Sequence, residues 1–403
     1  MSLVTVPELT VHDISEKVKP VTYLSNLTPL RGVAALLTVV FHLWIQFGSA
    51  LVGEGATAFN RMYLMVDFFF VLSGFIMCHV YGERFAKGVT KQAFKKFTIA
   101  RFSRVYPLHL VTLLYAILLF AFTGYLGIPK DIVEIENSWY SILTNILLLH
   151  AMNLHKWFNW VHASWSISTE WWAYMIFPFL VQPFMKIGKI GKVLVCAACL
   201  AGYLVITYFL VPLVTVPPSI PFVKVDPADL SINVAYQFGI VRCLCGFLLG
   251  MMMYQGYTAG WGKKIFGNGF TMLALTIILF IGMHYQVPDI FTVSLLPLIL
   301  LCGSYGSKSI DRIFSTTVLQ KLGDWSFSIY LVHQPVLFTI GKIVTYLSMG
   351  NAGKTATGPP PQPTMLNAWL ISAGIITLIL LISSLSYRFL EVPARTWINK
   401  KAA

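Results

Sequence analysis

The chain has 403 residues, of which 57% are apolar and only 11% are charged, whereas soluble domains carry about 25% charged residues. This composition excludes a soluble globular enzyme. The 29 Lys and Arg residues against 16 Asp and Glu residues give a formal charge of +13, and in so apolar a chain a basic excess indicates cytoplasmic loops of a membrane protein rather than a nucleic-acid partner.

Apolar windows of about 20 residues recur along the whole chain, each long enough to cross a hydrocarbon core of about 30 Å as a helix. These windows predict an all-α fold, a polytopic membrane protein of about ten transmembrane helices. A shorter apolar stretch at 139–151 is better suited to a re-entrant or interfacial helix than to a span. The ten expected spans are 30–47, 63–81, 106–122, 165–184, 193–211, 232–254, 270–283, 290–305, 327–347 and 365–386.

The basic residues are distributed unequally between the two sides of this topology. Ten spans place both chain ends on one side, and the segments on that side contain 22 of the 29 Lys and Arg residues, against five in the opposite loops. Because cytoplasmic loops are enriched in Lys and Arg, both termini are expected in the cytoplasm. The expected organisation is a cytoplasmic N-terminal segment at 1–29, a transmembrane domain at 30–390 and a cytoplasmic tail at 391–403.

The first span carries two ionisable residues on one face, Arg31 and His42. Their separation of eleven positions is about 20° from three whole turns and corresponds to a rise of about 16 Å. Arg31 is expected at the cytoplasmic end and His42 near mid-membrane, where an imidazole is tolerated in a polar cavity. Such a histidine suits proton transfer near neutral pH, and a hydrogen bond between helices is the structural alternative.

Two carboxylates lie near the outer ends of later spans, Asp67 in the second and Glu170 in the fourth. Either could reach the depth of His42, fix the tautomer of its imidazole and stabilise the imidazolium, so both are candidate catalytic residues. Either could instead be the counter-ion of Arg242, which also falls within a span.

The loop before the third span contains seven basic residues and ends in RFSRVYP, in which Arg101 and Arg104 are three positions apart. The two arginines share a face of one helical turn, and guanidinium groups bind phosphate oxygens in a bidentate way. A phosphate-bearing ligand that enters from the cytoplasm is therefore expected, whereas orientation and attraction to anionic lipids account for the lysines. The sequence lacks a phosphate-binding glycine loop, and its six cysteines lack zinc-site spacing, so no metal is predicted.

Aromatic residues and two histidines are interspersed in the outer segment HKWFNWVHASW at 155–165. This composition is more typical of an interfacial aromatic belt than of a sugar-stacking platform, and both interpretations stay open. Trp165 and Ser166, where the fourth span begins, are candidate substrate-binding residues. His333 in SIYLVHQPV could line the same cavity as His42 or make a structural hydrogen bond.

Taken in order, these motifs resemble the acyltransferase 3 family of membrane-bound acyltransferases. Arg31 and His42 in LRGVAALLTVVFHL match the Arg-x10-His signature of that family. Arg101 and Arg104 in RFSRVYPLHL match its Arg-x-x-Arg pattern. Each motif alone is weakly specific, but seven of them follow the family's order over the ten expected spans. The other five are MVDFFFVLSGFIM, SWSISTEWWAYMIFP, RCLCGFLLG, LGDWSFSIYLVHQPV and SYRFLEVPAR.

The resemblance implies transfer of an acyl group, commonly acetyl, from cytoplasmic acyl-CoA to a hydroxyl of a carbohydrate-type acceptor, often outside the cytoplasm. His42 would correspond to the proposed catalytic histidine of the family. Arg31, Arg101 and Arg104 would lie near the phosphates of coenzyme A. The implied donor is acetyl-CoA or another acyl-CoA, the implied acceptor is a glycan or glycolipid, and the implied location is a bacterial plasma (inner) membrane, where lipids surround the chain.

Two other classes of function are compatible with ionisable residues inside spans. A proton-coupled transporter of a small anionic or sugar solute would also carry such residues, although no repeated half is visible in the sequence. A lipid-binding or peptide-binding scaffold would show neither transfer nor uptake that depends on His42 or Arg101.

Overall fold

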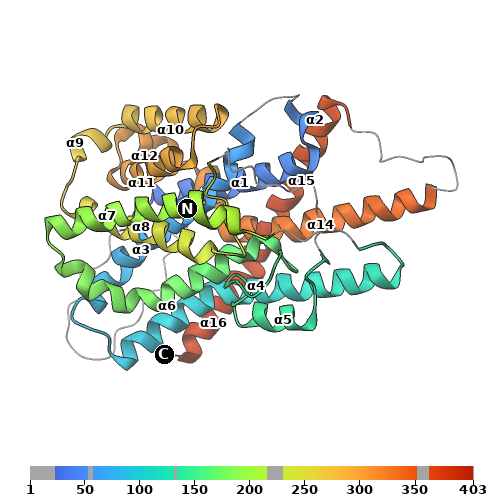
Figure 1. Cartoon of the computed structure of the whole chain (residues 1–403), viewed down its shortest axis with the longest axis horizontal. Coiled ribbons are helices and arrows are strands. Elements are labelled where there is room, and N and C mark those ends of the chain that lie inside the picture. The colour runs from blue at the N-terminus through green and yellow to red at the C-terminus, as the bar shows by residue number, and fades with distance from the viewer. Residues whose placement is uncertain (1–22, 53–57, 131–133, 216–229, 352–362, 403) are drawn as a thin grey trace.

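A computed structural model of the chain describes residues 23–52, 58–130, 134–215, 230–351 and 363–402 (Figure 1). Every regular element over these residues is a helix, and no strand is present among them. The prediction of an all-α membrane protein is confirmed. Of the expected N-terminal segment 1–29, residues 1–22 lie outside the described part.

Ten long helices in the described part of the chain coincide with the ten expected spans. Each one begins or ends within a few residues of the apolar window that predicted it, because a helix satisfies its backbone hydrogen bonds within its own segment. They are α1 (Leu27–Phe47), α3 (Met65–Phe85), α4 (Lys91–Tyr125), α6 (Trp165–Lys186), α7 (Lys189–Val205), α8 (Gly239–Thr258), α10 (Gly269–His284), α11 (Asp289–Tyr305), α14 (Ser326–Asn351) and α15 (Met365–Ser386).

Short elements connect the long helices. The short helix expected near 139–151 is α5 (Trp139–Ile146), which begins with a capping box between Ser138 and Ser141. The other short helices are α2 (Ser49–Val52), α9 (Lys263–Phe266), α12 (Lys308–Phe314), α13 (Thr317–Asp324) and α16 (Val392–Ala402). Short segments of 3-10 or π helix are η1 (Ala58–Leu64), η3 (His162–Ser164), η4 (Ile206–Leu210), η5 (Val211–Leu213) and η7 (Tyr387–Glu391).

Length and composition set the number of helices that can span the membrane. Within the described residues, seven helices are long and apolar enough, or eight if α11 and α12, which meet at 92°, form one span. The expectation of about ten is compatible with this count, because α10 is a further apolar helix of 16 residues and α6 coincides with an expected span.

Two interior helices, α3 and α8, pack against each other more extensively than any other pair (Figure 1). Their glycines permit the close approach: a Cβ atom on Gly74 would collide with the carbonyl of Phe247, and one on Gly250 with the carbonyl of Val71. Small residues take this role in membrane helices because van der Waals packing, rather than exclusion of water, drives helix association in lipid. The crossing fixes the position of the polar residues on α3 and α8.

A second close crossing joins α1 to the junction of α13 and α14. A Cβ atom on Gly32 would collide with the backbone at Leu322 and Gly323, and one on Gly323 with the backbone of Thr28. The start of α14 is therefore held against the start of α1, and the two helices continue side by side.

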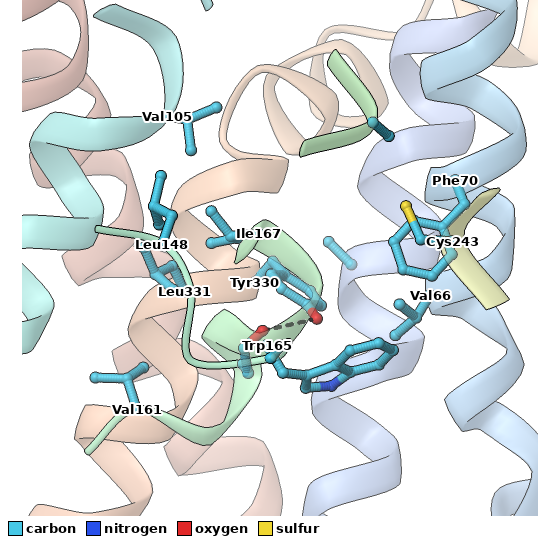
Figure 2. Packing of buried hydrophobic residues seen from close by; sticks show 14 of the residues in the cluster. Val66, Phe70, Val105, Leu148, Val161, Trp165, Ile167, Cys243, Tyr330 and Leu331 are labelled. Carbon is cyan, nitrogen blue, oxygen red and sulfur yellow. Dashed lines mark hydrogen bonds between the residues drawn. The ribbon is translucent and has the colours of Figure 1, made fainter. Parts of the chain in front are cut away.

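The core between these helices is aromatic and aliphatic. Figure 2 shows Trp165 of α6 and Tyr330 of α14 among buried side chains, with Val66 and Phe70 of α3 beside the indole. The rings of Phe70 and Trp165 meet edge to face, with their centroids 5.9 Å apart. This packing brings α3, α6 and α14 together around the polar residues described next.

Candidate active site

His42 lies three-quarters of the way along α1 and is half-buried. Its Nδ1 atom is 2.9 Å from the carbonyl oxygen of Thr38, four residues earlier in the helix. A carbonyl oxygen only accepts hydrogen bonds, so Nδ1 carries the proton and Nε2 keeps its lone pair. The backbone of α1 thus holds the imidazole in the tautomer that a general base needs.

His333 of α14 faces His42, with the two ring centroids 4.7 Å apart. Its Nδ1 atom is 3.3 Å from the carbonyl oxygen of Ile329, and its buried Nε2 atom has no hydrogen-bond partner among the described residues. The two histidines thus share the same backbone arrangement on neighbouring helices. His333 is next to His42, as the sequence allowed.

Tyr330 extends the pair of histidines toward α6. Its ring centroid is 6.0 Å from that of His333, and its hydroxyl oxygen is 2.6 Å from the Ser166 hydroxyl oxygen. The Tyr330 hydroxyl also donates to the carbonyl oxygen of Ala163 at 3.0 Å. We call His42, His333, Tyr330 and Ser166 the histidine cluster. Tyr330 was not singled out from the sequence, although it precedes His333 by almost one helical turn in the same motif.

Asp67 lies against Arg242, and both side chains are fully buried. The Arg242 guanidinium donates to the two carboxylate oxygens, with Nη2–Oδ2 at 2.5 Å and Nε–Oδ1 at 3.0 Å. The other guanidinium hydrogen bonds go to Asn233, to the carbonyl of Val234 and to the carbonyl of Tyr63. Asp67 is therefore the counter-ion of Arg242, the alternative that the sequence left open.

Trp165 lies on the Arg242 side of the core. The Arg242 guanidinium carbon is 5.5 Å from the Trp165 ring centroid, a cation–π distance, and the indole is almost completely buried. The structure therefore places Trp165 beside the buried ion pair, whereas its neighbour Ser166 points to Tyr330 in the histidine cluster.

Glu170 accepts hydrogen bonds from Ser73 of α3 and from Tyr174 one turn later on α6. Arg101 extends the same group, because its guanidinium carbon lies 5.8 Å from the Tyr174 ring centroid. Among the described residues, the hydrogen-bond partner of the His42 Nδ1 atom is the Thr38 carbonyl rather than a carboxylate. The catalytic roles predicted for Glu170 and Asp67 stay predictions.

Arg31 and Arg104 meet the start of α14 from two sides. Arg31 donates from Nε to the Ser326 hydroxyl and from Nη2 to the Gly323 carbonyl, both at 2.9 Å. The Arg104 guanidinium lies 5.8 Å from the Phe327 ring centroid, and its Nη1 atom is 4.0 Å from a carboxylate oxygen of Glu391. Arg31 and Arg104 are close enough to interact electrostatically.

Arg101 points from α4 toward α3 and α6 rather than toward α14. Its Nη2 atom donates to the Tyr81 hydroxyl at 3.0 Å, and its Nε atom is buried without a hydrogen-bond partner among the described residues. Both Arg101 and Arg104 act electrostatically on Glu170. We call Arg31, Arg101 and Arg104 the arginine mouth.

Arg31 of the arginine mouth and the two histidines lie along one pair of helices, α1 and α14. Arg31 contacts Ser326 near the starts of α1 and α14, and His42 lies next to His333 further along both helices. The separation is about 16 Å along α1 and about 10 Å along α14 at 1.5 Å per residue.

Asp324, the last residue of α13, borders the arginine mouth outside the spans. Burial raises the pKa of its carboxyl group, while the positive charges of Arg31 and Arg104 oppose this shift. No group of three or more His, Cys, Asp or Glu side chains within the described ranges is arranged to hold a metal ion.

Comparison with known proteins assigns this architecture to a family. A family model described as an acyltransferase domain matches residues 25–388. The chain is 30% identical over 334 residues to the acyltransferase MdmB of Streptomyces mycarofaciens, a match that covers 79% of this chain and 80% of that protein.

Two further relatives match over different lengths. The peptidoglycan O-acetyltransferase OatA of Listeria monocytogenes is 23% identical over 395 residues, which cover 93% of this chain but only 56% of that protein. Protein 2 in the picA locus of Rhizobium radiobacter is 33% identical over 153 residues, which cover 36% of this chain and 75% of that protein. No solved structure matches the chain.

Proposed function

Because the chain belongs to the acyltransferase 3 family, we propose that this multi-pass membrane acyltransferase moves an acyl group from cytoplasmic acyl-CoA to a hydroxyl of a carbohydrate-type acceptor. Acetyl is the proposed acyl group, in keeping with the name of the Listeria relative, an O-acetyltransferase. The observation that carries the proposal is the alignment of the arginine mouth and the histidine cluster along α1 and α14.

The arginine mouth suits the head of coenzyme A. Its phosphates are anionic, and guanidinium groups bind phosphate oxygens through parallel hydrogen bonds. The unpaired, buried Nε atom of Arg101 is a donor that a ligand oxygen would satisfy. With the head held there, the pantetheine arm would carry the thioester along α1 and α14 to His42, and this positioning would supply much of the rate.

The proposed chemistry at His42 is direct transfer. The Nε2 lone pair takes the proton of the acceptor hydroxyl, and the hydroxyl oxygen attacks the thioester carbonyl carbon to give a tetrahedral intermediate. The carbon–sulfur bond then breaks, and His42 returns the proton to the departing thiolate of coenzyme A. The Thr38 carbonyl keeps Nδ1 protonated throughout. His333, Ser166 and Trp165 are the proposed acceptor-side residues.

The proposed location is a bacterial inner membrane, with both termini and the arginine mouth on the cytoplasmic side. The charge bias of the loops supports this orientation, since 22 of the 29 basic residues fall on the side of the mouth. The proposed acceptor is a glycan or glycolipid outside the cytoplasm; the Listeria relative is named a peptidoglycan O-acetyltransferase. This chain spans 56% of that relative, so the acceptor of this chain is a separate proposal.

Acetyl-CoA binding tests the donor site. We expect micromolar binding by the purified full-length protein in detergent, measured by calorimetry, and loss of binding in an Arg101→Ala, Arg104→Ala double variant. A folded parent protein that binds no acetyl-CoA would contradict the proposal. Solute uptake by reconstituted protein without any acyl-CoA would favour the transporter instead.

A further inference from the structure

The last described segment of the chain folds back against the arginine mouth. After α15 ends at Ser386, the π-helical turn η7 leads into α16, which packs against α4. Asn399 of α16 donates to the Ser103 hydroxyl at 3.1 Å, next to Arg104. Single π turns are rare and occur often at functional sites. This turn ends at Glu391, the residue that faces Arg104.

The two carboxylate oxygens of Glu391 have different surroundings. Oε1 accepts a hydrogen bond from Ser328 on the first turn of α14. Oε2 is buried, has no hydrogen-bond partner among the described residues and lies 4.0 Å from the Arg104 Nη1 atom. At that distance the two charges attract each other, but the atoms are too far apart for a hydrogen bond.

The ion pair of Asp67 and Arg242 provides an internal comparison. Both of its side chains are fully buried, and the shortest nitrogen–oxygen distance is 2.5 Å. The Arg104 side chain is 22% exposed and does not hydrogen-bond Glu391. An ion pair that only stabilises the fold would lie at hydrogen-bond distance, because a buried carboxylate oxygen without a hydrogen bond costs free energy. The loose geometry therefore indicates a guanidinium that is free to exchange its anion.

The charges around the arginine mouth also indicate that Arg104 can exchange its anion. Glu391 interacts electrostatically with three arginines, Arg31, Arg104 and Arg395. The nearby Asp324 interacts with the same three. In the protein alone, the three guanidinium groups therefore share these two carboxylates, and any phosphate that binds Arg104 must compete with Glu391.

We propose that Glu391 is a built-in competing anion of the arginine mouth, which pairs with Arg104 when the coenzyme is absent and yields it to a coenzyme A phosphate when the donor binds. The inference rests on the proposed donor site. Ser328 holds one oxygen of Glu391 and so prevents the carboxylate from closing fully on Arg104. The competition weakens the hold on coenzyme A and speeds its release after transfer.

Acetyl-CoA binding by the full-length protein in detergent tests the competition directly. Glu391→Gln keeps the shape of the side chain and the acceptor for Ser328 but removes the charge. We expect this variant to bind acetyl-CoA about fivefold more tightly, the factor that a partly exposed ion pair is worth. Ser328→Ala releases Oε1 to close on Arg104, so we expect weaker binding in that variant.

A phosphate-free donor separates competition from a structural role. With acetyl-pantetheine as donor, the KM of Glu391→Gln should equal that of the parent protein, because no phosphate competes with the carboxylate. With acetyl-CoA, the KM should fall and its dependence on salt should steepen. Asp324→Asn is the matched control. Asp324 also interacts electrostatically with Arg104, but the structure describes both residues and shows no ion pair between them, so the effect of this variant on binding should be smaller.

The outcomes that would overturn the proposal are distinct. Unchanged or weaker acetyl-CoA binding by a folded Glu391→Gln protein would show that Glu391 positions Arg104 rather than competing for it. If the Asp324→Asn protein bound acetyl-CoA as tightly as the Glu391→Gln protein, the effect would come from net charge rather than from competition by Glu391. A folded parent protein that binds no acetyl-CoA would overturn the proposed donor site as well, a result separate from the other two.

Discussion

At the scale of single residues, the orientation of His42 depends on its own helix. The Thr38 carbonyl holds Nδ1, so the free lone pair on Nε2 does not require a carboxylate partner. In soluble enzymes of the triad type, a buried aspartate takes this place. A neighbouring imidazole, that of His333, lies next to the His42 ring, with the two ring centroids 4.7 Å apart.

Removal of the imidazole should abolish transfer without affecting donor binding. We expect His42→Ala to lower the rate of radiolabelled acetyl transfer by about 10²- to 10⁴-fold, the usual contribution of a general base. Acetyl-CoA binding should stay within twofold of the parent protein, because the arginine mouth is about 16 Å away along α1.

The matched control for His42→Ala is His284→Ala, at the exposed end of α10. This variant should transfer acetyl groups at the parental rate. Equal activity in the His42→Ala protein would show that another group takes the proton.

The Asp67–Arg242 pair should contribute to stability through its burial. We expect Asp67→Asn to lower the free energy of unfolding by about 3 kcal/mol or more, because it leaves a buried guanidinium without its counter-charge. Thermal unfolding in detergent measures the change. An Asp67→Leu, Arg242→Met double variant should lose less stability than the single variant. A single variant as stable as the parent would indicate that water or another anion reaches Arg242.

At the scale of helices, glycines decide which spans meet. Gly74 and Gly250 allow α3 and α8 to approach until their backbones touch, and Gly32 and Gly323 do the same for α1 and the start of α14. The second crossing positions Arg31 beside Ser326, and the course of the two helices beyond it brings His42 to His333. The geometry of the site therefore depends on residues without side chains.

A methyl group at the α3–α8 crossing should destabilise the protein. We expect Gly250→Ala to lower the free energy of unfolding by about 2 kcal/mol, since the Cβ atom would overlap the Val71 carbonyl and force the helices apart. Gly341→Ala on α14 is the matched control, because no atom lies within 4 Å of its Cβ position. It should be neutral or slightly stabilising, as alanine is a better helix former. Similar Tm values for the two variants would mean that the crossing tolerates a wider gap.

At the scale of the whole molecule, α4 joins the two ends of the bundle. It has 35 residues and is about 52 Å long, which exceeds the hydrocarbon thickness of about 30 Å. In Figure 1, α4 and α14 extend together past α5 toward the right end of the molecule. We therefore expect the arginines on the first half of α4 and the exposed residues at its far end to lie on opposite sides of the membrane.

Thiol labelling of intact cells would test this orientation. We expect a membrane-impermeant maleimide to label Tyr125→Cys, at the far end of α4, and to spare Lys91→Cys at its start until the cells are permeabilised. The side chain of Tyr125 is 87% exposed, and five of the six native cysteines are buried, so the native background should be low. Labelling of Lys91→Cys in intact cells would reverse the proposed orientation.

The sequence by itself determined the class of the fold and the position of most helices. Each span of an α-helical membrane protein satisfies its backbone hydrogen bonds internally, so its length and apolar composition are visible in a local window. The same local rule placed Arg31 and His42 on one face of α1, and the motifs around them indicated the family before any tertiary contact was known.

Only the tertiary structure decided which polar residues meet. Asp67 forms an ion pair with Arg242. Glu170 accepts a hydrogen bond from Ser73, and Glu391 accepts one from Ser328. Each pair joins helices that are far apart in the sequence. The periodicity of a helix fixes the face on which a residue lies, but not the neighbour that packs there. That neighbour depends on helix crossings, which van der Waals contact at a few glycines sets in the absence of a hydrophobic driving force between helices.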